Sequence, residues 1–160
     1  MTQEKAFQDY YEEIGSVCYG CGRLNEHGLQ IKSYWDGDES VCHFQPQPYH
    51  TAFPGYVYGG LIASLIDCHS TGTAAAAAYR AEGRLMDSDP ILRYVTGSLH
   101  VDYLRPTPID GPLTVRATVS EIQGRRITVA SELFAAGQLT ARGKVVCVRV
   151  PESWTENNAG

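Results

Sequence analysis

One carboxylate lies among glycines and apolar residues near the middle of the chain. Residues 53–78 read FPGYVYGGLIASLIDCHSTGTAAAAA, and Asp67 follows Gly60 by seven positions. If this run is a helix, seven residues advance the chain by about 10 Å. Glycine lets backbone amides approach a ligand closely, and the first amides of a helix have no partner within it. A carbonyl oxygen bound by the amides of Gly59 and Gly60, with Asp67 nearby as base or nucleophile, is therefore a possible catalytic pairing.

Two histidines lie close to this carboxylate and have different predicted roles. His69 is two positions from Asp67, so on a helix the two side chains point to different sides, and we interpret His69 as structural. His50 lies in the loop before the helix, where it could pair with Asp67, anchor the loop or contact a second subunit. Asp67 itself could be structural, with hydrogen bonds to Ser70, Thr71 or a second subunit.

A Cys-x-x-Cys motif, Cys18 to Cys21, lies in the glycine-rich stretch CYGCGRLNEHG, here called the cysteine loop (residues 18–28). A zinc site would need two further ligands, and no second pair with ligand spacing follows. A redox motif of the thioredoxin type should lie between a strand and a helix, whereas this stretch is typical of a loop. We therefore predict a turn with two half-buried thiols and no metal. The residues available as further zinc ligands would be Cys42, His43, His27 and His50.

The apolar character of residues 53–78 determines what must surround them. Apolar residues occur on nearly all sides of the expected helix, which therefore needs cover on nearly all sides. Most of the remaining chain alternates apolar and polar residues in the manner of strands. We predict an α+β fold in which a curved antiparallel sheet of about six strands wraps around one long central helix. The expected strands are residues 29–35, 39–45, 95–104, 113–122, 126–134 and 138–150.

The ends of the chain are expected to add little to this core. Residues 1–160 are predicted to form a single domain. Residues 1–24 form an N-terminal extension that contains a short amphipathic helix over 4–14 and the start of the cysteine loop. Residues 81–90 collect Gly, Asp, Ser and Pro, so the helix should end there in a loop long enough to be a mobile flap. Residues 151–160 are expected to fray.

Composition argues against several classes of function. The 160 residues are 43% hydrophobic and 19% charged, with a formal net charge of -5. No long basic run occurs, which argues against nucleic acid as a partner. No segment has the length and apolarity of a membrane span, and the charged N-terminus is unlike a signal peptide, so we predict a cytoplasmic protein. Five cysteines at irregular spacing favour reduced thiols over a disulfide framework, and no cofactor is predicted.

Four segments, in their order along the chain, resemble one known family. They are CYGCGRLNEHGL, PGYVYGGLIASLID, SLHVDYLRPTPIDGPLTV and KVVCVRV, and together they cover residues 18–150. They resemble the hotdog-fold acyl-CoA thioesterases of the PaaI-like group. The resemblance implies a homodimer or a dimer of dimers. It also implies active sites between subunits that hydrolyse an acyl-CoA substrate to a carboxylic acid and free CoA.

The resemblance assigns roles to individual residues. The family's helix carboxylate falls on Asp67, and its carbonyl-binding amide falls on Gly59 or Gly60. A hydroxyl residue on the following strand, which helps to orient water in the family, falls on Thr96 or Ser98. The predicted catalytic residues are Asp67, Gly59, Gly60 and Thr96, and the predicted substrate contacts are Tyr58, His50, Ser70, Arg125 and Arg126.

One departure from the family pattern and one related chemistry leave two alternatives open. Tyr58 stands where the family usually has a histidine, and a phenol donates a hydrogen bond but is no base near neutral pH. A non-catalytic protein that binds an acyl group or acyl-CoA is therefore one alternative. A dehydratase of the same fold, using His50 and Asp67, is the other. The phosphates of CoA need cationic partners, and Arg125 and Arg126 are those that we predict.

Overall fold

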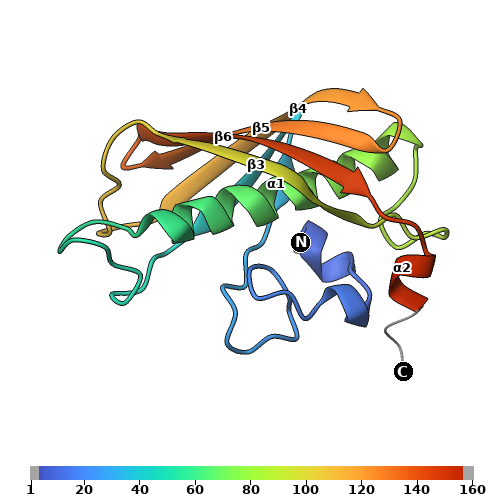
Figure 1. The fold of residues 1–160 in the computed structure, drawn as a ribbon, viewed down its shortest axis with the longest axis horizontal. Coiled ribbons are helices and arrows are strands. Elements are labelled where there is room, and N and C mark those ends of the chain that lie inside the picture. The colour runs from blue at the N-terminus through green and yellow to red at the C-terminus, as the bar shows by residue number, and fades with distance from the viewer. Residues whose placement is uncertain (1–3, 157–160) are drawn as a thin grey trace.

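One long helix lies against the concave face of a six-stranded antiparallel sheet (Figure 1). The computed structural model describes residues 4–156. The sheet has the order β1-β2-β4-β5-β6-β3, so that β4 and β5 lie at its centre. This architecture confirms the predicted α+β fold with one central helix. The elements are α1 (Gly59–Ala81), β1 (Tyr34–Asp36), β2 (Glu39–Phe44), β3 (Tyr94–Tyr103), β4 (Leu113–Gln123), β5 (Arg126–Ala135) and β6 (Gln138–Arg149).

Helix α1 is apolar around most of its circumference because it is covered on two opposite sides. On the sheet side, Leu65 and Ile66 are fully buried in one core with inward-facing side chains such as Val129 and Val145. Burying an aliphatic side chain of this size stabilises the fold by about 1.5–3 kcal/mol. Gly143 of β6 permits a close approach, because a Cβ at that position would lie 2.4 Å from the Cγ2 methyl of Ile66.

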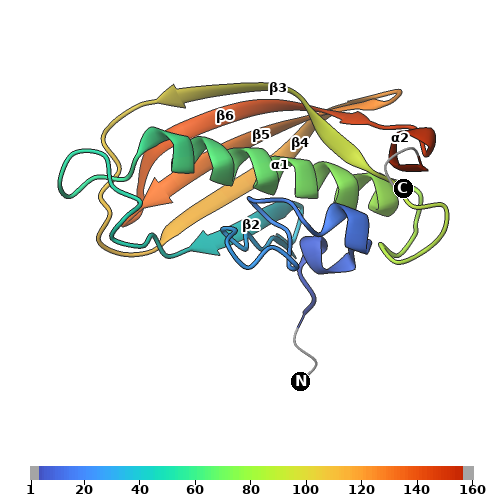
Figure 2. The same cartoon turned by 60° about the horizontal axis from the view of Figure 1, so that its bottom comes forward.

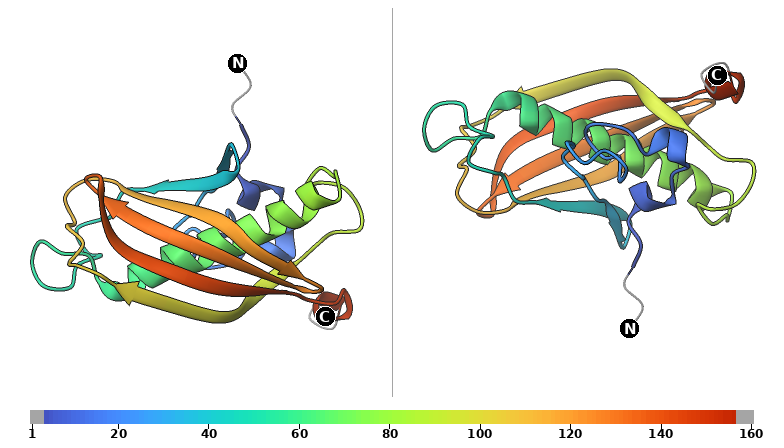
Figure 3. Two further views of the ribbon diagram at one scale, coloured as in Figure 1. Left: turned by 90° about the horizontal axis from the view of Figure 1, so that it is seen from above. Right: turned by 90° about the horizontal axis from the view of Figure 1, so that it is seen from below.

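The N-terminal segment (residues 4–33) covers α1 on the side away from the sheet (Figures 2 and 3). In place of the predicted helix over 4–14 it forms two short 3-10 turns, η1 (Phe7–Tyr10) and η2 (Glu13–Gly15). The segment is fixed by its tertiary contacts. The buried Gln8 side chain accepts a hydrogen bond from the Ser33 amide at 2.8 Å and donates one to the Ser33 hydroxyl at 2.9 Å.

The predicted strands are confirmed except at the first of them. Strands β3 to β6 begin and end within one residue of the predicted ranges. The hairpin over residues 29–45 is also present, but β1 begins only at Tyr34. The amides of Leu29 and Ile31 donate to the carbonyls of Tyr19 and Gly20 at 2.8 and 3.0 Å. Leu29 and Ile31 therefore bond to the cysteine loop, Ser33 bonds to η1, and residues 29–33 do not extend the sheet.

Buried polar side chains join α1 to both of its covers. The ring nitrogens of His69 lie 2.8 Å from the Ser33 hydroxyl and 3.0 Å from the Ser40 hydroxyl, so the predicted structural role of His69 is confirmed. Burial lowers the pKa of His69 to about 3, which keeps its ring neutral. The Ser70 hydroxyl lies 2.6 Å from that of Ser131 in β5 and is fully buried. Ser70 therefore packs against the sheet, and its role as a substrate contact stays a prediction.

The C-terminal segment begins with a short helix. This helix, α2 (Ser153–Glu156), follows β6, and the fraying predicted for residues 151–160 stays a prediction. The amide of Trp154 donates to the Pro151 carbonyl at 3.0 Å, and the Trp154 side chain lines the cavity described below. Residues 157–160 lie outside the described residues. Across residues 4–156, no helix is both long enough and apolar enough to cross a membrane.

Candidate active site

The carboxylate of Asp67 is held by a hydroxyl group from the sheet. Thr96 of β3 donates a hydrogen bond from Oγ1 to Oδ1 of Asp67. Thr71, one turn further along α1, donates to the main-chain carbonyl of Asp67 at 3.0 Å, and its hydroxyl lies 3.3 Å from that of Thr96. The fold thus brings together two of the predicted catalytic residues, one from the helix and one from the edge strand.

A β-bulge decides which hydroxyl group meets Asp67. The register of β3 on β6 shifts between Thr96, which pairs with the buried Cys147, and Ser98, which pairs with Val146. The inserted residue is Gly97, where a Cβ would lie 2.8 Å from a β6 methyl group. An extra residue reverses the alternation of faces along a strand. Thr96 therefore faces α1, whereas Ser98 is turned to the outer face.

The surroundings of Asp67 change the pKa of its carboxyl group in two opposite directions. Burial is the main cause that raises the pKa of this carboxyl above its ordinary value, and negative charge on the nearby Cys18 thiol raises it further. The hydrogen bond from Thr96 acts in the opposite direction, because it stabilises the carboxylate. A half-buried carboxylate with a raised pKa and a fixed orientation can accept a proton from a bound water more readily than an exposed one.

Asp67 and Thr96 open onto a cavity of about 490 Å³ between α1, β3 and the N-terminal turns. This volume lies within the range of small-molecule pockets, which are mostly apolar with a few polar groups. The cavity therefore offers room for an apolar chain or ring next to the carboxylate. Its apolar wall includes Ile14, Val17, Ile91 and Leu92.

The start of α1 presents backbone amides between two phenols. The first intrahelical bond at this end runs from the Leu61 amide to the Tyr58 carbonyl at 3.1 Å, so the amides of Gly59 and Gly60 precede it. The Tyr103 hydroxyl donates to the Gly59 carbonyl at 2.8 Å. The phenol of Tyr58 lies against Gly60, where a Cβ would be only 1.9 Å from the phenol oxygen.

The helix start and the carboxylate do not form one site within a single chain. Asp67 lies eight residues beyond Gly59, which is about 12 Å along the helix axis. Neither Gly59 nor Gly60 lines the cavity of Asp67. A thioester-sized group bound at one of these places would not reach the other on the same chain.

His50 is engaged in the loop that precedes α1. Its Nδ1 accepts a hydrogen bond from the Gln47 amide at 2.9 Å, and its ring centroid is 4.8 Å from that of Tyr49. Its carbonyl accepts from the Tyr58 amide at 2.9 Å, which ties the loop to the helix start. None of these contacts, all of them within one chain, reaches Asp67, and the dehydratase pairing of His50 with Asp67 stays a prediction.

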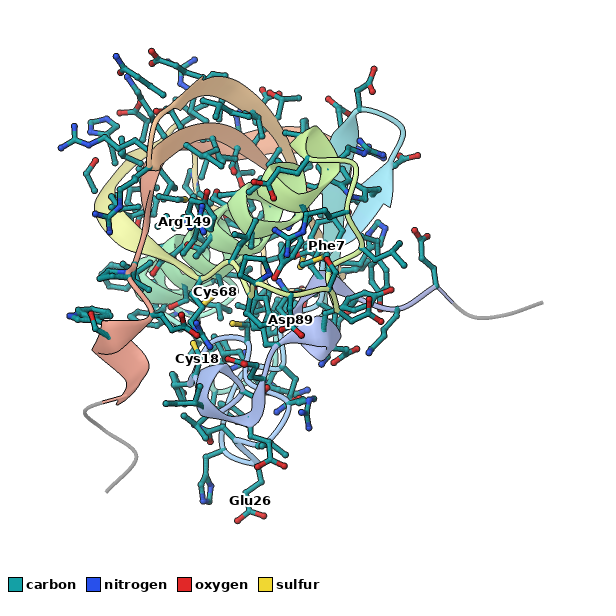
Figure 4. The ribbon with its side chains drawn as sticks, turned by 90° about the vertical axis from the view of Figure 1, so that its right-hand side faces the viewer. Phe7, Cys18, Glu26, Cys68, Asp89 and Arg149 are labelled. Atoms are coloured by element: carbon teal, nitrogen blue, oxygen red, sulfur yellow. The ribbon has the colours of Figure 1, made fainter. Side chains whose placement is uncertain are left out.

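The two arginines predicted to bind phosphate lie at the turn between β4 and β5. Arg125 and Arg126 are exposed, and the Arg125 guanidinium donates to the carbonyl of Arg149 at 2.8 Å. Arg149 is labelled in Figure 4. Neither Arg125 nor Arg126 lines the cavity of Asp67. Their role toward a substrate remains a prediction.

Comparison with known proteins identifies the family. The family model described as the Thioesterase superfamily matches residues 54–142, more than half of the chain. The chain belongs to the thioesterase superfamily. A thioesterase superfamily protein from Shewanella loihica is 46% identical, with a TM-score of 0.65 over 79% of this chain and 96% of that one. The Escherichia coli PaaI protein is 18% identical, with a TM-score of 0.62 over 77% and 81% of the two chains, and shares the predicted hotdog fold.

The curated relatives of this superfamily member are longer proteins. Acyl-coenzyme A thioesterase THEM4 of Xenopus laevis is 33% identical over 93 residues, which is 58% of this chain and 36% of the relative. THEM4 of Rattus norvegicus is 31% identical over 115 residues, which is 71% of this chain and 44% of the relative. The chain therefore spans less than half of the length of these relatives.

The superfamily match covers the helix start, Asp67 and Thr96 but begins after the cysteine loop. In that loop the structure shows a group that sequence reasoning missed. The sulfur atoms of Cys18, Cys21 and Cys68, here called the thiol cluster, all lie within 4.8 Å of one another. The third thiol comes from α1. The further zinc ligands considered from the sequence lie outside the thiol cluster, and they are Cys42, His43, His27 and His50.

The three thiols share their protons unequally. Hydrogen bonds from Cys21 and Cys68 lower the pKa of Cys18 to about 2, while donation to Cys18 raises the pKa of Cys21 to about 12. The predicted pair of half-buried thiols is in fact one exposed thiol, Cys18, and one buried thiol, Cys21. The position of Cys68 directly after Asp67 was visible in the sequence, but only the folded loop brings it to the other two.

Proposed function

We propose that this protein hydrolyses an acyl-CoA thioester to a carboxylic acid and CoA. The observation that carries the proposal is the carboxylate of Asp67, hydrogen-bonded by Thr96 at the wall of an apolar cavity. The names of the curated THEM4 relatives as acyl-coenzyme A thioesterases support the same chemistry. The apolar wall fits the acyl group, and the exposed Arg125 and Arg126 are the proposed partners of the CoA phosphates.

In the proposed reaction, amides at the start of α1 bind the carbonyl oxygen. The amides of Gly59 and Gly60 and the positive end of the helix stabilise the negative charge that develops on this oxygen. One such donor typically contributes about 3–4 kcal/mol to the transition state. Asp67 accepts a proton from the attacking water, whose oxygen bonds to the carbonyl carbon. The carbon–sulfur bond then breaks, and the leaving thiolate receives that proton from Asp67. Direct attack by the Asp67 carboxylate is the alternative role.

The proposed site is shared between two chains. The ten-residue strand β3 is an edge strand, and its Leu99 and Tyr103 side chains are 40% and 53% exposed. Such an edge favours pairing with a second copy. Two helices packed side by side and antiparallel would bring Gly60 of one chain near the partner subunit's Asp67, and one two-fold axis would create two equivalent sites. We propose a homodimer, or a dimer of dimers. The five free thiols favour a reducing compartment such as the cytoplasm.

Thiol release from a panel of acyl-CoA substrates tests the activity. We expect turnover in the unaltered protein, loss of it in Asp67→Ala, and retention of it in His50→Ala. The shared site is tested by mixing two inactive variants, Asp67→Ala and Gly60→Val. Re-formed heterodimers should recover part of the activity, because one of their two sites is intact. If the mixture stays inactive although heterodimers form, the shared site is refuted.

One observation favours a second candidate, a protein that binds acyl-CoA without turnover. The Tyr58 phenol lies against Gly60, at the place where the carbonyl oxygen would bind. If the phenol stays there, the amide donors are covered. Saturable binding of acyl-CoA with no thiol release across the whole panel would favour this candidate. Release that increases in Tyr58→Ala would show that the phenol limits access to a catalytic site.

A further inference from the structure

We propose that Cys18, Cys21 and Cys68 bind one zinc ion through three thiolates, and that this ion fastens the cysteine loop onto α1 beside Asp67. Cys18 and Cys68 are 50 residues apart along the chain, so the ion would join two distant parts of it. Figure 4 shows Cys18 on the loop and Cys68 on the helix facing each other across the boundary between the two. The proposal does not depend on thioester hydrolysis, because the ion is detected without any substrate.

The spacing of the three sulfur atoms suits a tetrahedral metal site. A zinc ion with Zn–S bonds of 2.3 Å holds its sulfur ligands about 3.8 Å apart. The Sγ atoms of Cys18 and Cys68 are 4.0 Å apart, and no pair in the cluster exceeds 4.8 Å. A disulfide joins only two sulfurs, at about 2.05 Å, and leaves the third thiol of the cluster without a role. Convergence of three thiols from two elements therefore favours a metal ion.

The backbone of the loop is arranged to support a metal-bound thiolate. Cys18 is followed by the sequence Tyr-Gly-Cys-Gly, and the Gly22 amide donates to the Cys18 carbonyl at 2.8 Å, which closes a tight turn. This turn fixes the backbone on both sides of the Cys18 and Cys21 side chains. Such fixed surroundings orient a ligand and tune its affinity for the metal.

Two glycines let the loop pass close to the third thiol. A Cβ at Gly20 would lie 2.3 Å from Sγ of Cys68, so only glycine allows the turn to rest on that sulfur. A Cβ at Gly22 would lie 2.3 Å from the carbonyl oxygen of Ser16. The loop is also anchored from outside, since the Ile31 amide donates to the Gly20 carbonyl at 3.0 Å. The cluster is thus built into the backbone and is not a chance contact of mobile side chains.

The charge around the cluster fits a cation. Asp67 and the half-buried Tyr11 lie close enough to interact with these thiols, and none of the ion pairs found in residues 4–156 provides them with a lysine or arginine. A divalent ion would offset the thiolate charge, and the thiol protons would pass to solvent on binding. All three cysteines line the cavity, so the fourth tetrahedral position is available to water.

Metal analysis of the full chain tests the proposal directly. The protein is purified with a non-chelating reductant, equilibrated with Zn²⁺, freed of excess metal and analysed for zinc. We expect about one ion per chain. Replacement of Zn²⁺ by Co²⁺ should produce thiolate-to-cobalt charge-transfer absorption together with the intense visible bands of tetrahedral coordination. Removal of the ion with a chelator should speed hydrogen exchange in the cysteine loop but not in β5.

Matched variants distinguish the cluster from the other thiols. Cys18→Ser and Cys68→Ser should weaken zinc binding by more than about 100-fold. Cys42→Ser is the control, because Cys42 is a buried thiol outside the cluster, and it should retain zinc. Circular dichroism checks that each variant is folded. A Co²⁺ spectrum of the unaltered protein without thiolate charge transfer would overturn the proposal whatever the variants do. The proposal would also be overturned if the purified protein contains no metal and its mass is lower by two hydrogens, because Cys18 has formed a disulfide.

Discussion

The two sides of α1 are covered by parts of the chain that are built in different ways. On one side, β3 to β6 form long antiparallel strands whose buried apolar side chains pack on the helix. On the other side, residues 4–33 contain only short 3-10 turns and loops, held by individual hydrogen bonds such as that between Gln8 and Ser33 and by a few buried side chains such as Phe7 and Ile31. Repetitive apolar packing makes the sheet side the more stable cover, whereas the N-terminal side depends on a few specific contacts.

Asp67 lies where these two covers meet, and each contributes something different to it. The sheet side supplies Thr96, which fixes the orientation of the carboxylate. The N-terminal side supplies Cys18 and much of the cavity wall, which determine the charge and polarity around the carboxylate. We infer that changes on the sheet side alter the stability of the fold and the geometry of the site. Changes on the N-terminal side should mainly alter the electrostatic surroundings of Asp67.

Asp67→Asn should produce the largest effect on activity. Asparagine keeps the size of the side chain and can still accept the Thr96 hydrogen bond, but it cannot take a proton from water. General-base catalysis contributes about 10²–10⁴-fold, so we expect kcat to fall by roughly 10³-fold. Asp38→Asn, at the exposed turn between β1 and β2, is the control and should keep its activity. Comparable kcat values for Asp67→Asn and the control would refute the catalytic role of Asp67.

The same variant should not lose stability at neutral pH. The folded-state pKa of Asp67 is raised, so the stabilising contribution of this carboxyl is present at low pH and is lost as pH rises through that pKa. Asparagine carries no charge at any pH. The Tm of metal-free Asp67→Asn should therefore equal or exceed that of the unaltered protein at pH 7, and the difference should shrink on acidification. Thermal unfolding at several pH values measures this.

The contrast between the two covers also explains how much could be predicted from the sequence. Alternation of apolar residues, together with Asp-Gly and Gly-containing turns, gave the central strands to within one residue. These signals are local. The partner of Gln8, the short β1 and the approach of Cys68 to the cysteine loop depend on contacts between distant residues, which no local pattern records. The choice of Thr96 over Ser98 needed the bulge at Gly97, which is a property of strand pairing.

Gly143→Ala should be the most destabilising substitution at a helix contact. The added Cβ would lie 2.4 Å from the Cγ2 methyl of Ile66 and 3.2 Å from the His100 carbonyl oxygen, inside the packed sheet side. Overpacking of this kind costs about 1–3 kcal/mol, which urea unfolding would measure. Combining it with Ile66→Leu removes the Cγ2 methyl and should restore part of the stability. If the double variant is no more stable than Gly143→Ala alone, the clash with Ile66 is not the cause.

Thr96→Val should have a smaller effect on rate and a directional effect on pH dependence. The Thr96 hydrogen bond stabilises the Asp67 carboxylate and lowers its pKa, in opposition to burial. Without this bond, the pKa of Asp67 rises, so the acid limb of kcat/KM should move to higher pH, and kcat should fall roughly tenfold. Metal-free protein is used throughout. Ser98→Val is the control on the outer face, and an acid limb that shifts equally in both variants would contradict the assignment.

Gly20→Ala should change stability least, although its added Cβ would approach a neighbour as closely as that of Gly143→Ala. This Cβ would lie 2.3 Å from Sγ of Cys68, but the contact is in the N-terminal cover, where the loop can move away from α1. We expect the free energy of unfolding to fall by less than about 1 kcal/mol, because little apolar packing is disturbed. Gly15→Ala is the control in the same segment, since its Cβ would meet nothing nearer than 3.7 Å. The loop movement should separate the thiols, so Gly20→Ala, unlike Gly15→Ala, should also bind zinc more weakly. A loss of stability as large as that of Gly143→Ala would mean that the N-terminal cover is packed as rigidly as the sheet, and the distinction between the two sides of α1 would fail.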